Sequence, residues 1–363
     1  MSTDKRLREY RDRIDKIDED ILALLNKRIE CAQAIGQVKS ETDSPAYRPE
    51  REAQVLQRLC ELNPGPAKNE EIARLFREVM SISRGAEVGL RVAYLGPDGS
   101  YSQAAALKHF GQAITPCSEA TIDDVFRAVE SGTADFAVLP VENSVEGGVT
   151  NTLDRLVETP LCVCGEIYLA IHHCLLSKGL QRSQIKTVLA HAQSLAQCRQ
   201  WLATHLPNAE LVSVTSNSEA ARQVSSIKNS AAIAGVSAAE LYELNVVDSN
   251  IEDRAGNTTR FLVLGSLETV SSGADKTSLL LSAKNRPGAL YHLLQPMVEH
   301  DVSMTRIESR PSRTGVWEYM FFIDVEGHRD DDDVRQVLAA LEHEASLLKI
   351  LGSYPRDVQW HVQ

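Results

Sequence analysis

The stretch LREYRDRIDKIDEDILALLNKRIECAQAIGQVK, residues 7–39, decides the fold of the N-terminal part of this 363-residue chain. Its apolar side chains recur at alternating steps of three and four residues, which is a heptad pattern. The pattern predicts one helix over residues 5–40, about 50 Å long at 1.5 Å per residue. Two shorter helices are predicted over 49–62 and 67–88. Neither is long enough to cover the whole apolar stripe, so a second copy of the chain is its simplest cover.

Arg28 stands in this stripe where the pattern demands an apolar side chain. A buried guanidinium without a partner costs roughly several kcal/mol, so something must neutralise it. Lys39 follows close to three helical turns later, so both cations share one face. Their neutralising partner is either a small anionic ligand or carboxylates of neighbouring helices. Arg11 lies about 25 Å from Arg28 along the helix axis, so both can contact one small anion only if they come from two chains.

The composition limits the partners of this chain. Lys and Arg number 38 against 50 Asp and Glu, a net charge of −12, which argues against a nucleic-acid or anionic membrane surface as partner. The sequence has no apolar run long enough to span a bilayer and no secretory signal. Its seven cysteines lack a disulfide framework or a zinc-binding spacing, and the His172-His173 pair is interpreted as the end of a strand. We therefore expect a cytoplasmic protein without metal or cofactor.

Two further segments follow linkers at 85–89 and 271–273. Residues 91–268 alternate short apolar strands with polar loops and helices, which is the pattern of an α/β domain. Residues 276–363 give the order β-α-β-β-α-β, a split βαβ arrangement. The predicted domains are therefore 1–90, 91–268 and 276–363.

Residues 5–88 resemble the all-helical chorismate mutase domain. The resemblance is carried by Arg11, by ALLNKRIECAQAIGQVK, by YRPERE and by the final turn of the third helix. It implies the following substrate-binding residues: Arg11, Arg28, Lys39, Arg48, Glu52, Ser83 and Glu87.

The same resemblance implies the role of each residue. Arg11 of one protomer and Arg28 of the other hold the two carboxylates of chorismate, while Lys39 donates to the ether oxygen whose bond breaks. Glu52 holds a hydroxyl, and Glu87 would have to be protonated to donate to that ether oxygen. The catalytic residues of this site are then Arg28, Lys39 and Glu87. The reaction is a unimolecular rearrangement, which needs a compact substrate conformer and positive charge near the developing enolate oxygen.

The middle segment resembles prephenate dehydratase. The matching strings are YLGPDGSYSQ, VENSVEGGVTNTLD, HAQSLAQC and NTTRFLVLG. The resemblance implies a two-lobed, periplasmic-binding-protein-like α/β fold with Thr259 as the key catalytic residue. We expect Thr259 to orient the substrate and donate a hydrogen bond, since Thr is a weak acid. The other implied substrate contacts are Glu142, Asn143, Ser144, Gln197, Arg260 and Phe261.

The third segment resembles an ACT regulatory domain with a ferredoxin-like α+β fold. The strings NRPGALYHLL and IESRP match its two phenylalanine-binding motifs. A glycine followed by a helix N-terminus suits close approach of a carboxylate. The implied allosteric residues are Gly288, Ala289, Leu290, Glu308, Ser309, Arg310 and Pro311.

Together these resemblances imply a bifunctional enzyme that rearranges chorismate to prephenate and converts prephenate to phenylpyruvate, with feedback inhibition by phenylalanine. A homodimer is expected, and whether ACT pairing raises it to a tetramer is left open. One alternative is a monofunctional dehydratase whose helical segment is a dimerisation arm. The cations of the helical segment count against it, because an arm could have a fully apolar stripe. Another alternative is a non-enzymatic amino-acid sensor.

Overall fold

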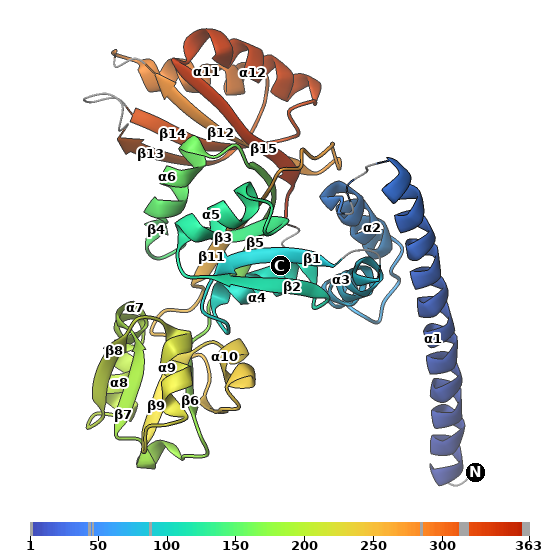
Figure 1. The fold of residues 1–363 in the computed structure, drawn as a ribbon, viewed down its shortest axis with the longest axis vertical. Helices are drawn as coiled ribbons and strands as arrows, with labels where there is room; N and C mark the ends of the chain where they lie inside the picture. Colours follow the sequence, from blue (N-terminus) through green and yellow to red (C-terminus); the bar gives the residue numbers. More distant parts are fainter. Residues whose placement is uncertain are drawn as a thin grey trace.

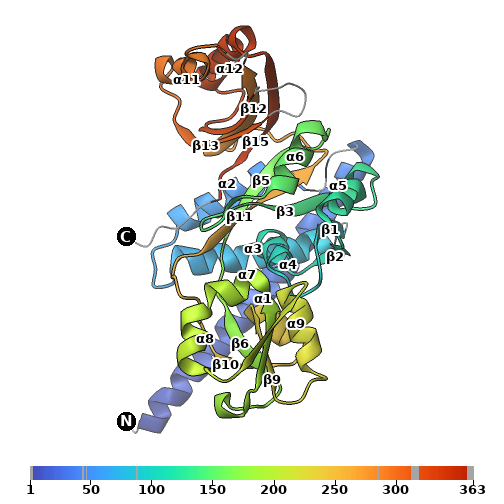
Figure 2. The ribbon, with the colours of Figure 1, turned by 90° about the vertical axis from the view of Figure 1, so that its left-hand side faces the viewer.

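The structure, a computed structural model, describes residues 3–42, 45, 47–86, 89–283, 286–311 and 319–357. Three parts are stacked along the long axis of the body, and one long helix, α1, projects beside them (Figures 1 and 2). Among the described residues, no helix combines the length and apolar character needed to cross a membrane.

The N-terminal region consists of α1 (Thr3–Thr42), α2 (Pro49–Glu61) and α3 (Asn69–Gly85), close to the ranges predicted. Helix α2 begins with a proline at its first turn, where no backbone N–H is required. Helices α2 and α3 pack on the central domain through Tyr47, which is buried against Phe110 and Phe136. Only the C-terminal half of α1 packs against α3, as shown by the partial burial of Leu25, Ile29, Ala32 and Gly36.

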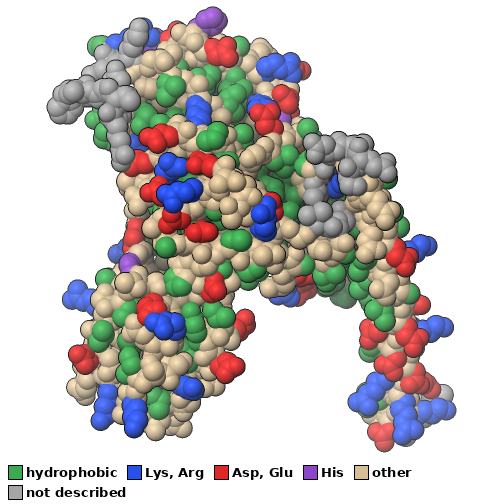
Figure 3. Space-filling view, viewed as in Figure 1, with side chains coloured by type: hydrophobic (Ala, Val, Ile, Leu, Met, Phe, Trp, Pro, Cys, Tyr) green, Lys and Arg blue, Asp and Glu red, His purple; other side chains and the backbone are tan. Residues whose placement is uncertain are grey.

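The heptad stripe of α1 stays uncovered in the single chain. Its N-terminal members are 48% to 66% exposed, and Ile35 and Val38 nearer the C-terminus are similarly exposed. Figure 3 shows hydrophobic side chains among charged ones on the projecting helix. The stripe members exposed in the N-terminal half are Leu7, Tyr10, Ile14, Ile17, Ile21 and Leu24. Such a continuous apolar face is unusual on a monomer and is typical of an interaction surface.

The central domain has two lobes, as expected from the sequence. The sheet of lobe one has the order β2-β1-β3-β11-β5, with β4 beside β3. Its strands are β1 (Leu90–Leu95), β2 (Ile114–Glu119), β3 (Phe136–Asn143), β4 (Gly147–Gly148), β5 (Cys162–Ala170) and β11 (Thr258–Gly265). Its helices are α4 (Tyr101–Phe110), α5 (Ile122–Glu130) and α6 (Thr150–Glu158).

Lobe two is a second sheet, of order β10-β6-β9-β7-β8. Its strands are β6 (Cys174–Ser177), β7 (Thr187–His191), β8 (Glu210–Val214), β9 (Ser230–Ala234) and β10 (Asn245–Asp248). Its helices are η1 (Arg182–Gln184), α7 (Ala192–Gln197), α8 (Arg199–His205), α9 (Asn217–Val224) and α10 (Val236–Leu241). The chain passes between the lobes twice, at residues 171–173 and 249–257. Residues at these crossings therefore lie beside both lobes.

The C-terminal domain has the predicted β-α-β-β-α-β order, with an antiparallel sheet β13-β14-β12-β15. Its elements are β12 (Asp275–Ala283), α11 (Ala289–Glu299), β13 (Met304–Pro311), β14 (Tyr319–Glu326), α12 (Asp332–Glu344) and β15 (Leu347–Pro355). Leu280, Leu351 and Tyr354 of this domain belong to the same buried cluster as Leu139 and Leu262 of lobe one. The two domains therefore share one hydrophobic core.

Candidate active sites

Arg28 is the cation that the sequence singles out, and the structure directs it from α1 to the last turns of α3. Its NH1 donates to the Val79 carbonyl (3.3 Å) and to the Ser83 hydroxyl. Partial burial lowers the pKa of the Arg28 guanidinium. No carboxylate of the described part of the chain forms an ion pair with it. The geometry leaves a desolvated positive charge beside a hydroxyl, an arrangement that suits a carboxylate ligand.

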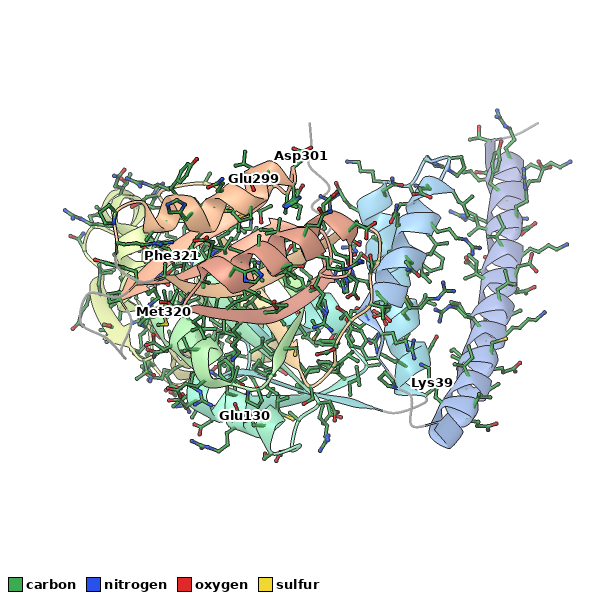
Figure 4. The ribbon with its side chains drawn as sticks, turned by 90° about the horizontal axis from the view of Figure 1, so that it is seen from above. Lys39, Glu130, Glu299, Asp301, Met320 and Phe321 are labelled. Carbon is green, nitrogen blue, oxygen red and sulfur yellow. The ribbon has the colours of Figure 1, made fainter. Side chains whose placement is uncertain are left out.

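The other residues predicted for the helical site are spread over the three helices. Figure 4 places Lys39 near the end of α1 that approaches α2. Arg11 is exposed on the projecting half of α1, and Arg48 is exposed at the start of α2. Glu87 lies outside the described residues. The single chain therefore brings Arg28 and Ser83 together but leaves Arg11 far from them.

Glu52 of α2 has a partner that sequence reasoning missed. Its Oε1 accepts from Arg84, which also donates to the Phe110 carbonyl of the central domain (2.7 Å) and lies over the Tyr47 ring. Arg84 is buried, at the helical spacing of Ala73, Met80 and Ser81, and Ser83 is the other buried residue of α3. In the sequence, the sign of this contact is that a charged residue, Arg84, stands on the face of the helix that is buried. The Arg84 contact uses only one oxygen of the Glu52 carboxylate, among the contacts of the described residues.

Thr259 and Asn143 meet at the end of the lobe-one sheet that adjoins the crossings to lobe two. Strands β11 and β3 are antiparallel, and their register places the two residues opposite each other. Asn143 Nδ2 donates to Thr259 Oγ1 (2.9 Å) and to Asn257 Oδ1 (2.8 Å). Ser144 continues the pairing, since its backbone N–H donates to the Thr258 carbonyl (2.9 Å). These contacts fix the Thr259 hydroxyl, which is the group expected to contact substrate.

Lobe two brings Gln197 to this junction between the lobes. Its Oε1 lies 2.8 Å from His173 Nε2, and its Nε2 donates to Glu146 Oε1 of lobe one (3.3 Å). On the other side of the imidazole, Tyr101 Oη lies 3.1 Å from His173 Nδ1. Burial lowers the pKa of His173, so the ring is neutral near pH 7. The Glu146–Gln197 contact therefore joins the two lobes directly.

The sequence interpretation of His173 missed this position. We expected the histidine pair to end a strand, and it does follow β5, but His173 is buried at the crossing between the lobes. Glu146, Asn257 and Tyr101 were also not singled out. The sequence indicated only a polar segment where the chain crosses between the lobes. It did not indicate the partners of these residues, because their contacts join parts of the chain that are far apart in sequence.

Three other residues predicted for the dehydratase site point elsewhere. Phe261 is buried in the lobe-one core. Arg260 is buried against the C-terminal domain, where its Nε donates to Glu166 (3.0 Å) and its NH1 pairs with Asp324 (2.5 Å). Glu142 accepts from Arg306 of β13 (2.6 Å). Glu142 and Arg260 are register partners on the sheet, so one face of the sheet carries both.

The predicted effector-binding residues fall on two elements. Gly288 has φ of 79°, a conformation that favours glycine, and precedes Ala289 and Leu290 at the start of α11. On β13, Glu308 pairs with Arg306, and Arg310 donates to the Thr150 carbonyl (3.1 Å). Ser309 and Pro311 alternate with these residues and are exposed.

Comparisons with known proteins agree with this three-part arrangement. The family descriptions "Chorismate mutase type II", "Prephenate dehydratase" and "ACT domain" match residues 10–88, 92–269 and 277–343. A bifunctional chorismate mutase/prephenate dehydratase of Stutzerimonas stutzeri is 51% identical over 99% of this chain and 100% of its own length. The chain belongs to the bifunctional chorismate mutase/prephenate dehydratase family.

Further relatives in this family include a Neisseria gonorrhoeae protein of the same name, 52% identical over 99% of both chains. Among solved structures, the prephenate dehydratase of Arthrobacter aurescens in complex with L-Phe has a TM-score of 0.67 and 34% identity, covering 74% of this chain and 90% of that one. The Staphylococcus aureus prephenate dehydratase has a TM-score of 0.65 and 28% identity, covering 73% of this chain and 100% of that one. We refer below to α1–α3 as the mutase helices, to the two lobes as the dehydratase domain and to the last domain as the ACT domain.

Proposed function

We propose that this chain catalyses two consecutive reactions, chorismate to prephenate and prephenate to phenylpyruvate, and that phenylalanine bound to the ACT domain inhibits the second. We further propose domain limits of 1–90, 91–268 and 276–363. The observation that carries the proposal is the pair of polar sites described above, one on the mutase helices and one between the dehydratase lobes. The cytoplasmic location remains a prediction.

The mutase site is proposed to form between two chains. Arg28 would hold one substrate carboxylate, and Arg11 of a partner chain would hold the other. The reason is that roughly 25 Å of helix separates Arg11 from Arg28 within one chain. Lys39 would supply positive charge to the ether oxygen whose bond breaks. The second oxygen of Glu52 would accept from a substrate hydroxyl. The exposed apolar stripe of α1 supports the homodimer that this site requires.

The dehydratase site is proposed to form within one chain. Prephenate loses carbon dioxide and hydroxide as the ring becomes aromatic, and one proton converts the hydroxide to water. Asn143 donates to Thr259 Oγ1, and among the described residues this is the hydrogen bond that Oγ1 makes. The Thr259 hydroxyl hydrogen can then be directed at the departing oxygen, while Gln197 of lobe two contacts Glu146 beside the same strands.

Two assays on the purified full-length chain test this proposal. Loss of chorismate and formation of phenylpyruvate from prephenate should both be measurable, and phenylalanine should lower only the second rate. Phenylpyruvate formation without chorismate loss across about pH 5 to 8 would favour the dimerisation-arm alternative. Absence of both reactions would contradict the proposal and favour a sensor.

A further inference from the structure

The central strands of the dehydratase domain carry different chemistry on their two faces. In β3 and β11, Asn143 and Thr259 contact each other at the proposed substrate site, while their neighbours Glu142 and Arg260 face the ACT domain. Side chains alternate between faces along a strand, so one short motif serves both surfaces. A displacement of either strand by the ACT domain therefore moves Asn143 or Thr259 as well.

The β13 strand of the ACT domain presents a matching row of charges. Arg306, Glu308 and Arg310 alternate with exposed residues and are directed at the β3–β4 hairpin and α6. Arg306 contacts two carboxylates, with Nε donating to Glu142 (2.6 Å) and NH2 to Glu308. Gly148 of the hairpin lies so close to Glu308 that an added Cβ would overlap its carboxylate. The hairpin that carries Glu142 and Asn143 is thus held by β13.

The two contacts between these faces differ in solvent access. The Arg260–Asp324 pair is only about 5% exposed on either side and is shared with Glu166, which suits a fixed anchor. In the Arg306 cluster, the Arg306 side chain is 11% exposed, but Glu142 is 38% and Glu308 24% exposed. A partly solvated carboxylate exchanges partners at much lower free energy than a buried one. The Arg306 cluster is therefore the adjustable contact of the two.

We propose that Arg306 is a positioning residue for the dehydratase reaction, which holds the β3–β4 hairpin through Glu142 and whose hold changes when an amino acid binds at Glu308. The inference rests on the proposed function and adds the residue through which the effector acts. The ammonium group of an α-amino acid and the Arg306 guanidinium compete for the Glu308 carboxylate. When Glu308 turns to the ligand, Arg306 keeps Glu142 as its single carboxylate, and the hairpin beside Asn143 shifts accordingly.

Kinetics of Arg306→Gln in the full-length chain test this inference. We expect the dehydratase kcat to fall about tenfold with little change in KM, because Arg306 contacts the face of the sheet opposite to Asn143 and Thr259. The phenylalanine concentration for half-inhibition should change at least about fivefold. Arg306→Lys keeps the positive charge, but its single ammonium group lacks the planar guanidinium that contacts both carboxylates. This variant should therefore recover much of the kcat and little of the phenylalanine response.

The matched control is Arg329→Gln. Arg329 also joins the ACT domain to a glutamate of the dehydratase segment, Glu268, which follows the end of β11 opposite to Thr259. It should behave as wild type in both measurements. Mutase activity in each preparation reports folding, and Gly148→Ala, which crowds Glu308 from the hairpin side, should also change the phenylalanine response.

Each result separates the inference from the proposed function. A wild-type kcat and phenylalanine response in Arg306→Gln would overturn the inference, as would equal losses in Arg329→Gln. If Arg306→Gln also loses mutase activity, the chain is misfolded and Gly148→Ala becomes the test. An unchanged phenylalanine response in Gly148→Ala would then overturn the inference. A wild-type chain without dehydratase activity would instead contradict the proposed function itself.

Discussion

The mutase helices and the dehydratase domain differ in how much of a site one chain supplies. In the dehydratase domain, Thr259, Asn143 and Gln197 are fixed by hydrogen bonds within the chain. In the mutase helices, Arg28 is in place, but Arg11 is exposed on the half of α1 that projects away from the body (Figure 1). The comparison therefore separates a proposed dehydratase site whose residues all come from one chain from a proposed mutase site that requires Arg11 of a second chain.

The largest expected effect tests the mutase half of this comparison. Arg28→Ala should lower mutase kcat/KM roughly a thousandfold, because it removes a desolvated cation that faces the substrate carboxylate. Dehydratase activity should persist, since Arg28 contacts α3 alone in the described residues. Lys27→Ala, a neighbouring exposed cation, is the control and should retain both activities. Loss of both activities in Arg28→Ala would show that the two regions are not independent.

Mixing two inactive chains tests whether the mutase site is shared. Arg11→Ala and Arg28→Ala chains, unfolded together and refolded, should recover about a quarter of wild-type mutase activity. Half of randomly formed dimers are mixed, and each mixed dimer has one intact site. Recovery of no activity would place the complete site within one chain.

The dehydratase side is tested by Thr259→Ala, which should lower the dehydratase kcat roughly a hundredfold and leave the mutase rate unchanged. Unlike Arg28, this residue needs no partner chain, so dilution that dissociates a dimer should not alter the effect. The control is Thr258→Ala, whose hydroxyl contacts the Gly256 carbonyl (3.4 Å) and not Asn143. Equal losses in the two variants would indicate general damage to β11.

Sequence periodicity predicted the elements better than it predicted the directions of side chains. The three-and-four spacing gave the length of α1, and the element order of the last segment was confirmed. The motif containing Thr259 was recognised as one unit, yet Arg260 within it points to the ACT domain. The alternation of side chains along a strand predicts that Thr259 and Arg260 point to opposite faces of the sheet. It does not predict which domain packs on the second face, because that depends on the tertiary structure. The same holds for Arg84 and His173, whose burial comes from neighbours distant in the chain.

Arg260→Ala and Thr259→Ala, on opposite faces of β11, should differ in their effect on the free energy of unfolding. Removal of Arg260 leaves Asp324 and Glu166 buried with one cation fewer, which should cost about 3 kcal/mol of unfolding free energy. Thr259→Ala should cost much less. Urea titration of the full-length chain, followed by fluorescence and by dehydratase activity, measures both. An Arg260→Ala chain as stable as wild type, but inactive, would instead favour a direct contact of Arg260 with substrate.

The smallest expected effect concerns the contact between the two regions compared here. Tyr47 Oη lies 2.8 Å from His109 Nε2, and burial lowers the pKa of His109 from 6.5 to about 3. Between these values the unfolded chain binds a proton that the folded chain does not, so stability falls as the pH falls below 6.5. From about pH 7 to about pH 5 the loss is at most roughly 2 kcal/mol, because His109 keeps some access to solvent.

His109→Gln removes this titration and keeps a polar group beside Tyr47. Its unfolding free energy in urea should therefore decline less than that of wild type over the same pH interval, by up to about 2 kcal/mol. His205→Gln, at an exposed position on α8, is the control and should decline as wild type does. If wild type and His109→Gln lose stability equally, other groups cause the acid sensitivity. The mutase helices would then be held to the dehydratase domain by contacts that do not titrate, such as the packing of Tyr47 against Phe110 and Phe136.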